Sequence, residues 1–188
     1  MRILVAAASR HEATAEVAHA IAAVLRRANI DVDERRPVEV ADLAAYDGVV
    51  LGSAIYAGHW LKPAKDLVER TSTRMRALPV WLFSTGPLGV PPKPEGLPVE
   101  VASILVQSGA REHRVFGGRL DKRELGFGEK ALVRLVGAAE GDYRPWHEIE
   151  AWAGDIASTL RGSTKVASPL TPTSQVQTHR YTNERASS

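Results

Sequence analysis

The sequence contains no cysteine among its 188 residues. This absence excludes disulfides, thiolate metal sites and a cysteine nucleophile, although it says little about the cellular compartment. No apolar run approaches the roughly 18–20 residues that a membrane-spanning helix needs. The first residues also lack the length and the cleavage-site pattern of a signal peptide. We therefore expect a cytoplasmic protein with at most peripheral membrane contact.

The sequence also lacks a large excess of positive or negative charge and the common nucleotide-binding motifs. The formal net charge is +2, and no arginine-rich run or basic helix face is present, so we expect no nucleic-acid partner. The six histidines are scattered without an HxH or HxxxH pair, which argues against a metal site. Neither GxxxxGK(S/T) nor GxGxxG occurs, which excludes the two commonest nucleotide-binding loops.

What is present is a regular alternation of apolar runs and helical patterns. Strands are expected at 2–8, 30–35, 48–53, 79–84 and 113–120. Helices are expected at 14–28, 61–72, 98–108 and 146–161, with a further helical segment at 128–138. This order predicts an α/β fold, a doubly wound sheet of five parallel strands in a three-layer αβα sandwich. The alternating pattern of 30–35 is typical of an edge strand with one wet face.

The composition changes after Gly162. Residues 163–188 are rich in Ser, Thr, Pro and Gln and contain almost no large apolar side chains. Such a segment buries too little surface to offset its ordering entropy. We therefore predict a folded domain at 1–162 and a disordered tail at 163–188.

Three predicted strand ends are followed by loops suited to a ligand, because open α/β sheets bind ligands outside the carboxyl ends of their strands. In the first loop Ser9 and Thr14 flank the start of a helix, where hydroxyls and free amides favour a phosphate. The second, 52–60, mixes glycine, serine, aromatics and a histidine. The third, 84–89, begins Ser-Thr-Gly. An ordinary capped helix start explains the first loop equally well, and the third could be an ordinary turn, so Thr85 and Gly86 count as candidates because the other two loops point to the same place.

Two residues of the second loop have a competing structural interpretation. His59 is either a ligand contact or a capping and packing residue, whereas Trp60 is expected to anchor the following helix in the core.

On the last helix, Trp146 and Trp152 serve either the core or an interface, so the oligomeric state stays open. A response-regulator domain is excluded, because Ala6-Ala7-Ala8 stands where its acidic cluster is needed.

The ordered set of loops resembles the flavodoxin-like domain family, most closely its menaquinone-dependent protoporphyrinogen oxidase branch. That branch carries a hydroxyl-Arg-x-Gly-x-Thr loop where this chain has residues 9–14, and the segments 52–60, 115–120 and 140–144 are also similar. The resemblance covers about residues 2–161. It implies FMN as the cofactor. The cofactor-binding residues that it and the loop chemistry suggest are Ser9, Arg10, His11, Ala13, Thr14, Ser53, Ala54, Ile55, Tyr56, Gly58, Ser84, Thr85 and Gly86.

The function that the resemblance implies is an FMN-dependent oxidoreductase or electron-transfer protein. A redox partner or small molecule would complete the reaction, with a quinone or a porphyrinogen suggested by the same resemblance. The main departure is Glu12, which stands where the branch has glycine. A carboxylate about 6 Å from a phosphate repels it by roughly 3 kcal/mol at an effective dielectric near 20. The alternative is therefore a flavin-free binding or regulatory module whose phosphate loop is degraded by Glu12.

Overall fold

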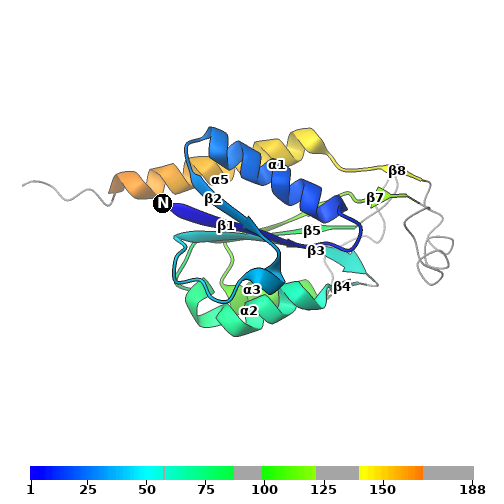
Figure 1. The fold of residues 1–188 in the computed structure, drawn as a ribbon, viewed down its shortest axis with the longest axis horizontal. Helices are drawn as coiled ribbons and strands as arrows, with labels where there is room; N and C mark the ends of the chain where they lie inside the picture. The colour runs from blue at the N-terminus through cyan, green and yellow to red at the C-terminus, as the bar shows by residue number, and fades with distance from the viewer. Residues whose placement is uncertain (57, 87–98, 122–139, 167–188) are drawn as a thin grey trace, which may run out of the picture.

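A computed structural model describes residues 1–56, 58–86, 99–121 and 140–166 of the chain. Its centre is a parallel sheet with the strand order β2-β1-β3-β5-β6 (Figure 1). The parallel strands are β1 (Arg2–Ala8), β2 (Asp31–Arg35), β3 (Gly48–Tyr56), β5 (Val80–Thr85) and β6 (Glu112–Phe116). The order reverses beside β1, as in a doubly wound sheet. This confirms the predicted fold class and its five parallel strands.

Helices cover both faces of this sheet (Figure 1). Helices α1 and α5 pack together on one face, and α2 and α3 pack together on the other. Their bounds are α1 (Ala13–Arg27), α2 (Lys62–Met75), α3 (Val99–Ser108) and α5 (Trp146–Val166), with a short 3-10 turn η1 at Pro37–Glu39. The result is the three-layer sandwich that the alternation of elements predicted.

The alternation of side chains along each strand divides the core into two halves. Val5 and Phe83 pack against α1 and α5, whereas Leu4 and Leu82 pack against α2 and α3. These strands are apolar throughout because both faces of the sheet are covered. At the edge, β2 has only half-buried and exposed residues, as its sequence pattern predicted.

Two short pairs of strands were not predicted. The strand β4 (His59–Trp60) turns back on β3, and its antiparallel pairing extends β3 to Tyr56 instead of the predicted end at Ser53. The expected strand 113–120 is divided. Its first part is β6, and its last residues form β7 (Arg119–Leu120), which pairs with β8 (Gly141–Asp142) in a separate two-stranded sheet.

The ends of α1 and α3 agree with the prediction to within one residue, whereas α2 and α5 run beyond their predicted ends, α2 to Met75 instead of residue 72. Helix α3 ends before Gly109, whose φ of 64° suits a glycine at that position. Helix α5 does not stop at Gly162, as predicted, but continues to Val166, because its hydrogen-bonded backbone carries one glycine without a break. The predicted helical segment 128–138 and most of the predicted tail lie outside the described residues.

Candidate functional site

The three loops singled out in the sequence meet at the carboxyl edge of the sheet. The register sets Ala8 beside Ser53, and Ser53 beside Ser84, so that the ends of β1, β3 and β5 lie side by side. A direct bond closes the arrangement. The hydroxyls of Thr14 and Thr85, at the start of α1 and the end of β5, are 2.7 Å apart. The structure therefore gathers these loops at one place.

The loop between β1 and α1 ends in an unusual backbone conformation at Glu12. This residue has φ 53° and ψ −18°, the left-handed region that L side chains with a Cβ occupy at a cost. A glycine would adopt it freely, which gives a physical reason for expecting glycine at this position. The Glu12 residue itself is exposed.

The hydroxyls that flank this loop are used differently. The backbone N–H of Thr14 donates to the Ser9 hydroxyl over 3.3 Å, so Ser9 lies across the first turn of α1. The Thr14 side chain, by contrast, is only 1% exposed and faces Thr85. Ser9 is thus the better placed of the two to offer its hydroxyl to a ligand, while Thr14 joins α1 to β5.

Tyr56 lies beside the same loop, at the end of β3. The guanidinium carbon of Arg10 is 4.8 Å from the centre of the Tyr56 ring, and the His11 ring is 6.4 Å from it at an angle of 57°. Arg10 is exposed, and Tyr56 is half-buried. The cluster combines an aromatic surface with a cation next to the loop, which suits a ligand that has both a planar ring and a negative charge.

Ser53 and Ser84 have hydroxyls that face inward instead. Both residues are fully buried. The Ser53 hydroxyl donates to the carbonyl of Ala54 and accepts the backbone N–H of Leu61, the residue immediately before α2. The Ser84 hydroxyl accepts the Trp60 indole N–H over 2.7 Å. These two serines therefore support the loops through their side chains and leave only backbone groups for a ligand.

A histidine that the sequence did not single out joins this inner network. The Nε2 atom of His113, on β6, is 2.8 Å from the Ser84 hydroxyl. Its Nδ1 atom is buried and has no hydrogen-bond partner among the described residues. Burial lowers the pKa of His113 from 6.5 to about 4, so the ring is neutral near pH 7.

The β3–β4 turn is fixed to α3 by one carboxylate. Glu100 accepts the backbone N–H of Trp60 over 3.0 Å and pairs with Lys65 Nζ at 2.8 Å. Burial alone would raise the pKa of Glu100, but the hydrogen bonds from Lys65 and from the Trp60 backbone, together with the positive charge of Lys65, outweigh it and hold that pKa low. Trp60 is 2% exposed, which confirms it as a core anchor. His59 is exposed, with Nδ1 3.5 Å from Glu100.

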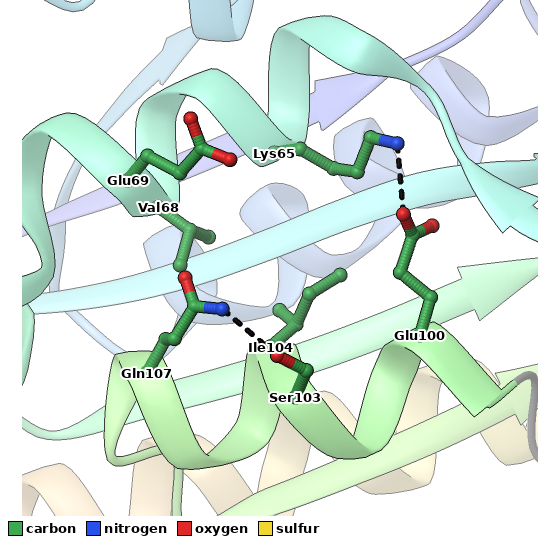
Figure 2. A pocket seen from close by; sticks show the side chains of 7 residues that line it. All are labelled: Lys65, Val68, Glu69, Glu100, Ser103, Ile104 and Gln107. Atoms are coloured by element: carbon green, nitrogen blue, oxygen red, sulfur yellow. Dashed lines mark hydrogen bonds and ion pairs between the residues drawn. The ribbon is translucent and has the colours of Figure 1, made fainter.

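The Glu100–Lys65 pair lies at one end of a shallow groove between α2 and α3 (Figure 2). The groove has a volume of about 110 Å³, and four of its polar side chains form two pairs, Lys65 with Glu100 and Gln107 with Ser103. It lies on the face opposite to α1, and therefore away from the loop at Ser9–Thr14. We regard it as the seam between two packed helices.

Comparison with known proteins agrees with this geometry. The family model for the flavodoxin domain matches residues 4–145. The chain belongs to the flavodoxin domain family. No curated protein sequence matches it.

Solved structures show the same fold at low sequence identity. An archaeal flavodoxin has a TM-score of 0.58 at 15% identity, with 86% of this chain and 99% of that chain covered. A flavodoxin from Pseudomonas aeruginosa has a TM-score of 0.58 at 15% identity, and the match covers 86% of this chain and 100% of that chain. The rubredoxin oxygen:oxidoreductase of Desulfovibrio gigas has a TM-score of 0.61 at 12% identity. That match covers 89% of this chain but only 37% of the larger protein.

Membership of the flavodoxin domain family makes FMN the cofactor and electron transfer the general role of this domain. The residues at the carboxyl edge fit such a group. Ser9 and the N-terminal amides of α1 offer donors to a phosphate. Gly86 lies so close to β3 that a Cβ there would be 3.1 Å from the Ile55 carbonyl oxygen. Gly58, at φ 82°, has open space around its Cα.

Two arginines at this edge were missed as site residues. Arg119, on β7, reaches the backbone of the β1–α1 loop, and Arg144, just after β8, reaches the backbone of the first residue of α1. They follow the loop by more than 100 residues in the chain, so no local spacing could have linked them to it.

The described residues show neither a metal cluster nor a membrane span. Within residues 1–56, 58–86, 99–121 and 140–166, no group of three or more acidic or histidine side chains is placed to hold a metal ion. In the same part of the chain no helix combines the length and apolar character needed to cross a bilayer.

Proposed function

We propose that this flavodoxin domain binds FMN at the carboxyl edge of its sheet and works as an oxidoreductase or electron-transfer protein. The observation that carries the proposal is the 2.7 Å bond between the Thr14 and Thr85 hydroxyls, because it joins the first loop to the third. The proposed contacts are Ser9, Arg10, His11, Ala13 and Thr14 for the phosphate end, and Ser53, Ala54, Ile55, Tyr56, Gly58, Ser84, Thr85 and Gly86 for the ring.

Each end of the cofactor has a different partner chemistry. The Ser9 hydroxyl and the first amides of α1 donate to the phosphate, and the cation of Arg10 lies nearby. The Tyr56 ring supplies a surface for stacking, and the backbone at Gly58 and Gly86 allows close approach to the polar edge of the ring. When bound, FMN supplies the redox chemistry, while the protein orients it and tunes its potential.

Glu12 sets a limit on the expected affinity. Its carboxylate is close in sequence to every proposed phosphate donor, and repulsion of about 1–3 kcal/mol corresponds to a loss of roughly five- to a hundredfold in affinity. Its exposure to solvent favours the weaker end of that range, because water screens the charge. We therefore propose FMN binding that is weakened and not abolished.

A flavin titration tests this proposal directly. FMN fluorescence quenching is measured with the purified chain, and riboflavin, which lacks the phosphate, is the control. Binding of FMN that is at least tenfold tighter than that of riboflavin is expected if the loop holds the phosphate. Absence of binding at tens of micromolar FMN would leave the alternative, a flavin-free binding or regulatory module with a phosphate loop degraded by Glu12.

For the reaction itself we propose oxidation of a porphyrinogen with a quinone as electron acceptor. The support is the similarity of residues 9–14, 52–60 and 140–144 to the protoporphyrinogen oxidase branch. The test is an anaerobic assay of the FMN-loaded chain with a porphyrinogen, with and without a menaquinone analogue, followed by porphyrin fluorescence. Porphyrin formed only with the quinone supports the proposal, and flavin reduction by other donors alone contradicts it.

A further inference from the structure

Two arginines donate hydrogen bonds to carbonyls at the start of α1, one in the β1–α1 loop and one on the first residue of the helix. Arg119 Nη2 donates to the carbonyl oxygen of His11 over 3.3 Å. Arg144 Nη1 donates to the carbonyl oxygen of Ala13 over 3.1 Å. These two carbonyls lie on either side of Glu12, the residue in the left-handed conformation.

Acidic residues hold both guanidinium groups in place. Glu16 accepts from Arg119 Nη1 at 2.8 Å and from Arg144 Nη1 at 2.7 Å, so one carboxylate joins the two arginines. Asp142 accepts from Arg144 Nε at 2.8 Å and from Nη2 at 2.7 Å, a two-point contact. The hydrogen bond from Arg144 holds the pKa of Asp142 below its usual value, with burial opposing it. The cluster is therefore ionised near neutral pH.

Arg144 is buried where it makes these contacts. Its side chain is 3% exposed, and its guanidinium carbon lies 4.4 Å from the centre of the Trp146 ring. Arg119 is less buried, with 26% of its side chain exposed. Figure 1 places β7 and β8, which carry Arg119 and Asp142, at the end of the molecule where α1 begins.

Planarity of the peptide bond turns these contacts into control of the loop amides. The C=O of one residue and the N–H of the next lie in one plane and point in opposite directions. Fixing the carbonyls of His11 and Ala13 therefore fixes the N–H groups of Glu12 and Thr14, which point away from the arginines. The Thr14 N–H accordingly points to the Ser9 hydroxyl.

We propose that Arg119 and Arg144 are positioning residues, which hold the β1–α1 loop in the conformation that presents its amides to a phosphate. This inference deepens the proposed FMN site and rests on it. The same two bonds flank Glu12 and so stabilise its left-handed backbone, which explains how a non-glycine residue is kept there.

The effect is geometric, because the charges of the cluster cancel. Arg119 and Arg144 carry two positive charges, and Glu16 and Asp142 carry two negative ones. A lysine in place of Arg144 would preserve this balance. It could not, however, contact Asp142 at two points and reach Ala13 and Glu16 as well, since an ammonium group lacks the planar fork of donors.

The experiment compares FMN and riboflavin binding in Arg144→Lys, Arg119→Lys and the wild-type chain. The matched control is Arg26→Lys, at the far end of α1, where Arg26 pairs with Glu34 at 3.3 Å. We expect Arg144→Lys to weaken FMN binding about tenfold and riboflavin binding less than about twofold. The reason is that the lost charged hydrogen bonds affect only the phosphate end of the site. The control should leave both affinities unchanged.

Other outcomes separate this inference from the proposed function. If the wild-type chain binds FMN no tighter than riboflavin, the proposed function fails and the inference fails with it. If the wild-type chain prefers FMN and both lysine variants keep that preference, only the inference is overturned. Arg119→Lys leaves the buried Arg144 contacts in place. Its preference for FMN over riboflavin therefore tests the inference even if Arg144→Lys does not fold.

A readout without flavin completes the test. Amide hydrogen exchange of Glu12 and Thr14, followed by NMR in the FMN-free protein, should become faster in both lysine variants, with amides in the middle of α1 unchanged. Equal exchange rates in the variants and the wild-type chain would contradict positioning by the arginines.

Discussion

Glu12 is unfavourable at its position for two reasons, its backbone conformation and the charge of its side chain. Its φ of 53° costs a non-glycine residue about 1 kcal/mol, and its carboxylate opposes a phosphate. We expect Glu12→Gly to raise the free energy of unfolding by about 1 kcal/mol and to tighten FMN binding several-fold. Urea unfolding and FMN fluorescence quenching measure the two effects.

Glu12→Gln separates these causes, because it removes the charge and keeps the Cβ. It should tighten FMN binding without raising stability. A Glu12→Gly chain that is less stable than the wild type would show that the left-handed conformation carries no cost here.

His113 is the residue that should make stability depend on pH. Its pKa is lowered by burial from 6.5 to about 4, so the unfolded chain takes up a proton that the folded chain resists between these values. Stability is therefore fully present above about pH 6.5 and is lost as the pH falls towards 4. The free energy of unfolding therefore decreases between about pH 6.5 and pH 4. With allowance for partial exposure, His113→Gln should make this decrease about 2 kcal/mol smaller.

Urea unfolding at several pH values from 7 to 4 checks this expectation. The slope against pH is compared, because the substitution also changes packing against Trp60 at every pH. His147→Gln, at an exposed position, is the matched control. An unchanged slope in His113→Gln would show that other groups cause the acid dependence.

The bond between Thr14 and Thr85 is the contact that joins two elements at the site. Thr85→Val keeps the shape and leaves the Thr14 hydroxyl, 1% exposed, without this partner. We expect a loss of about 1–2 kcal/mol in the free energy of unfolding, the typical cost of a buried polar group left unpaired. Changing both residues to valine should be close to neutral, because neither hydroxyl is then left without its partner.

A double-mutant cycle measures this coupling, and FMN affinity is followed in the same four proteins. If Thr14 donates to the phosphate as well, Thr14→Val weakens FMN more than Thr85→Val does. Additive losses of stability in the cycle would contradict a direct bond between the two hydroxyls.

At the scale of the whole molecule, we propose that the folded domain ends with α5 and that the remaining residues are a disordered tail. Helix α5 ends at Val166, and its Ile149, Trp152 and Ile156 are part of the core against α1. Ending the chain after residue 166 should leave the urea midpoint and the FMN affinity unchanged, since the segment beyond has almost no large apolar residues. A lower midpoint would show that the segment packs on the domain. Ending it after residue 148 should prevent folding.

The site was only partly visible in the sequence. Ser9, Tyr56 and Gly86 were predicted because loops that follow buried strands carry characteristic residue types, and the structure places them at the carboxyl edge of the sheet. Ser53 and Ser84 were predicted in the same way, but their hydroxyls face inward and bond the backbone N–H of Leu61 and the indole of Trp60. Local composition predicts which backbone lies near a ligand, and it does not predict which way a side chain points.

The sequence by itself determined the α/β class, the five parallel strands and the edge position of β2. These depend on the spacing of apolar residues, which is a local property that each segment carries alone. Only the tertiary structure decided that β3 continues to Tyr56, that β7 pairs with β8, and that Arg119 and Arg144 reach the loop around Glu12. Such contacts join segments that are distant in the chain, and they form only when the folded sheet brings their backbones together.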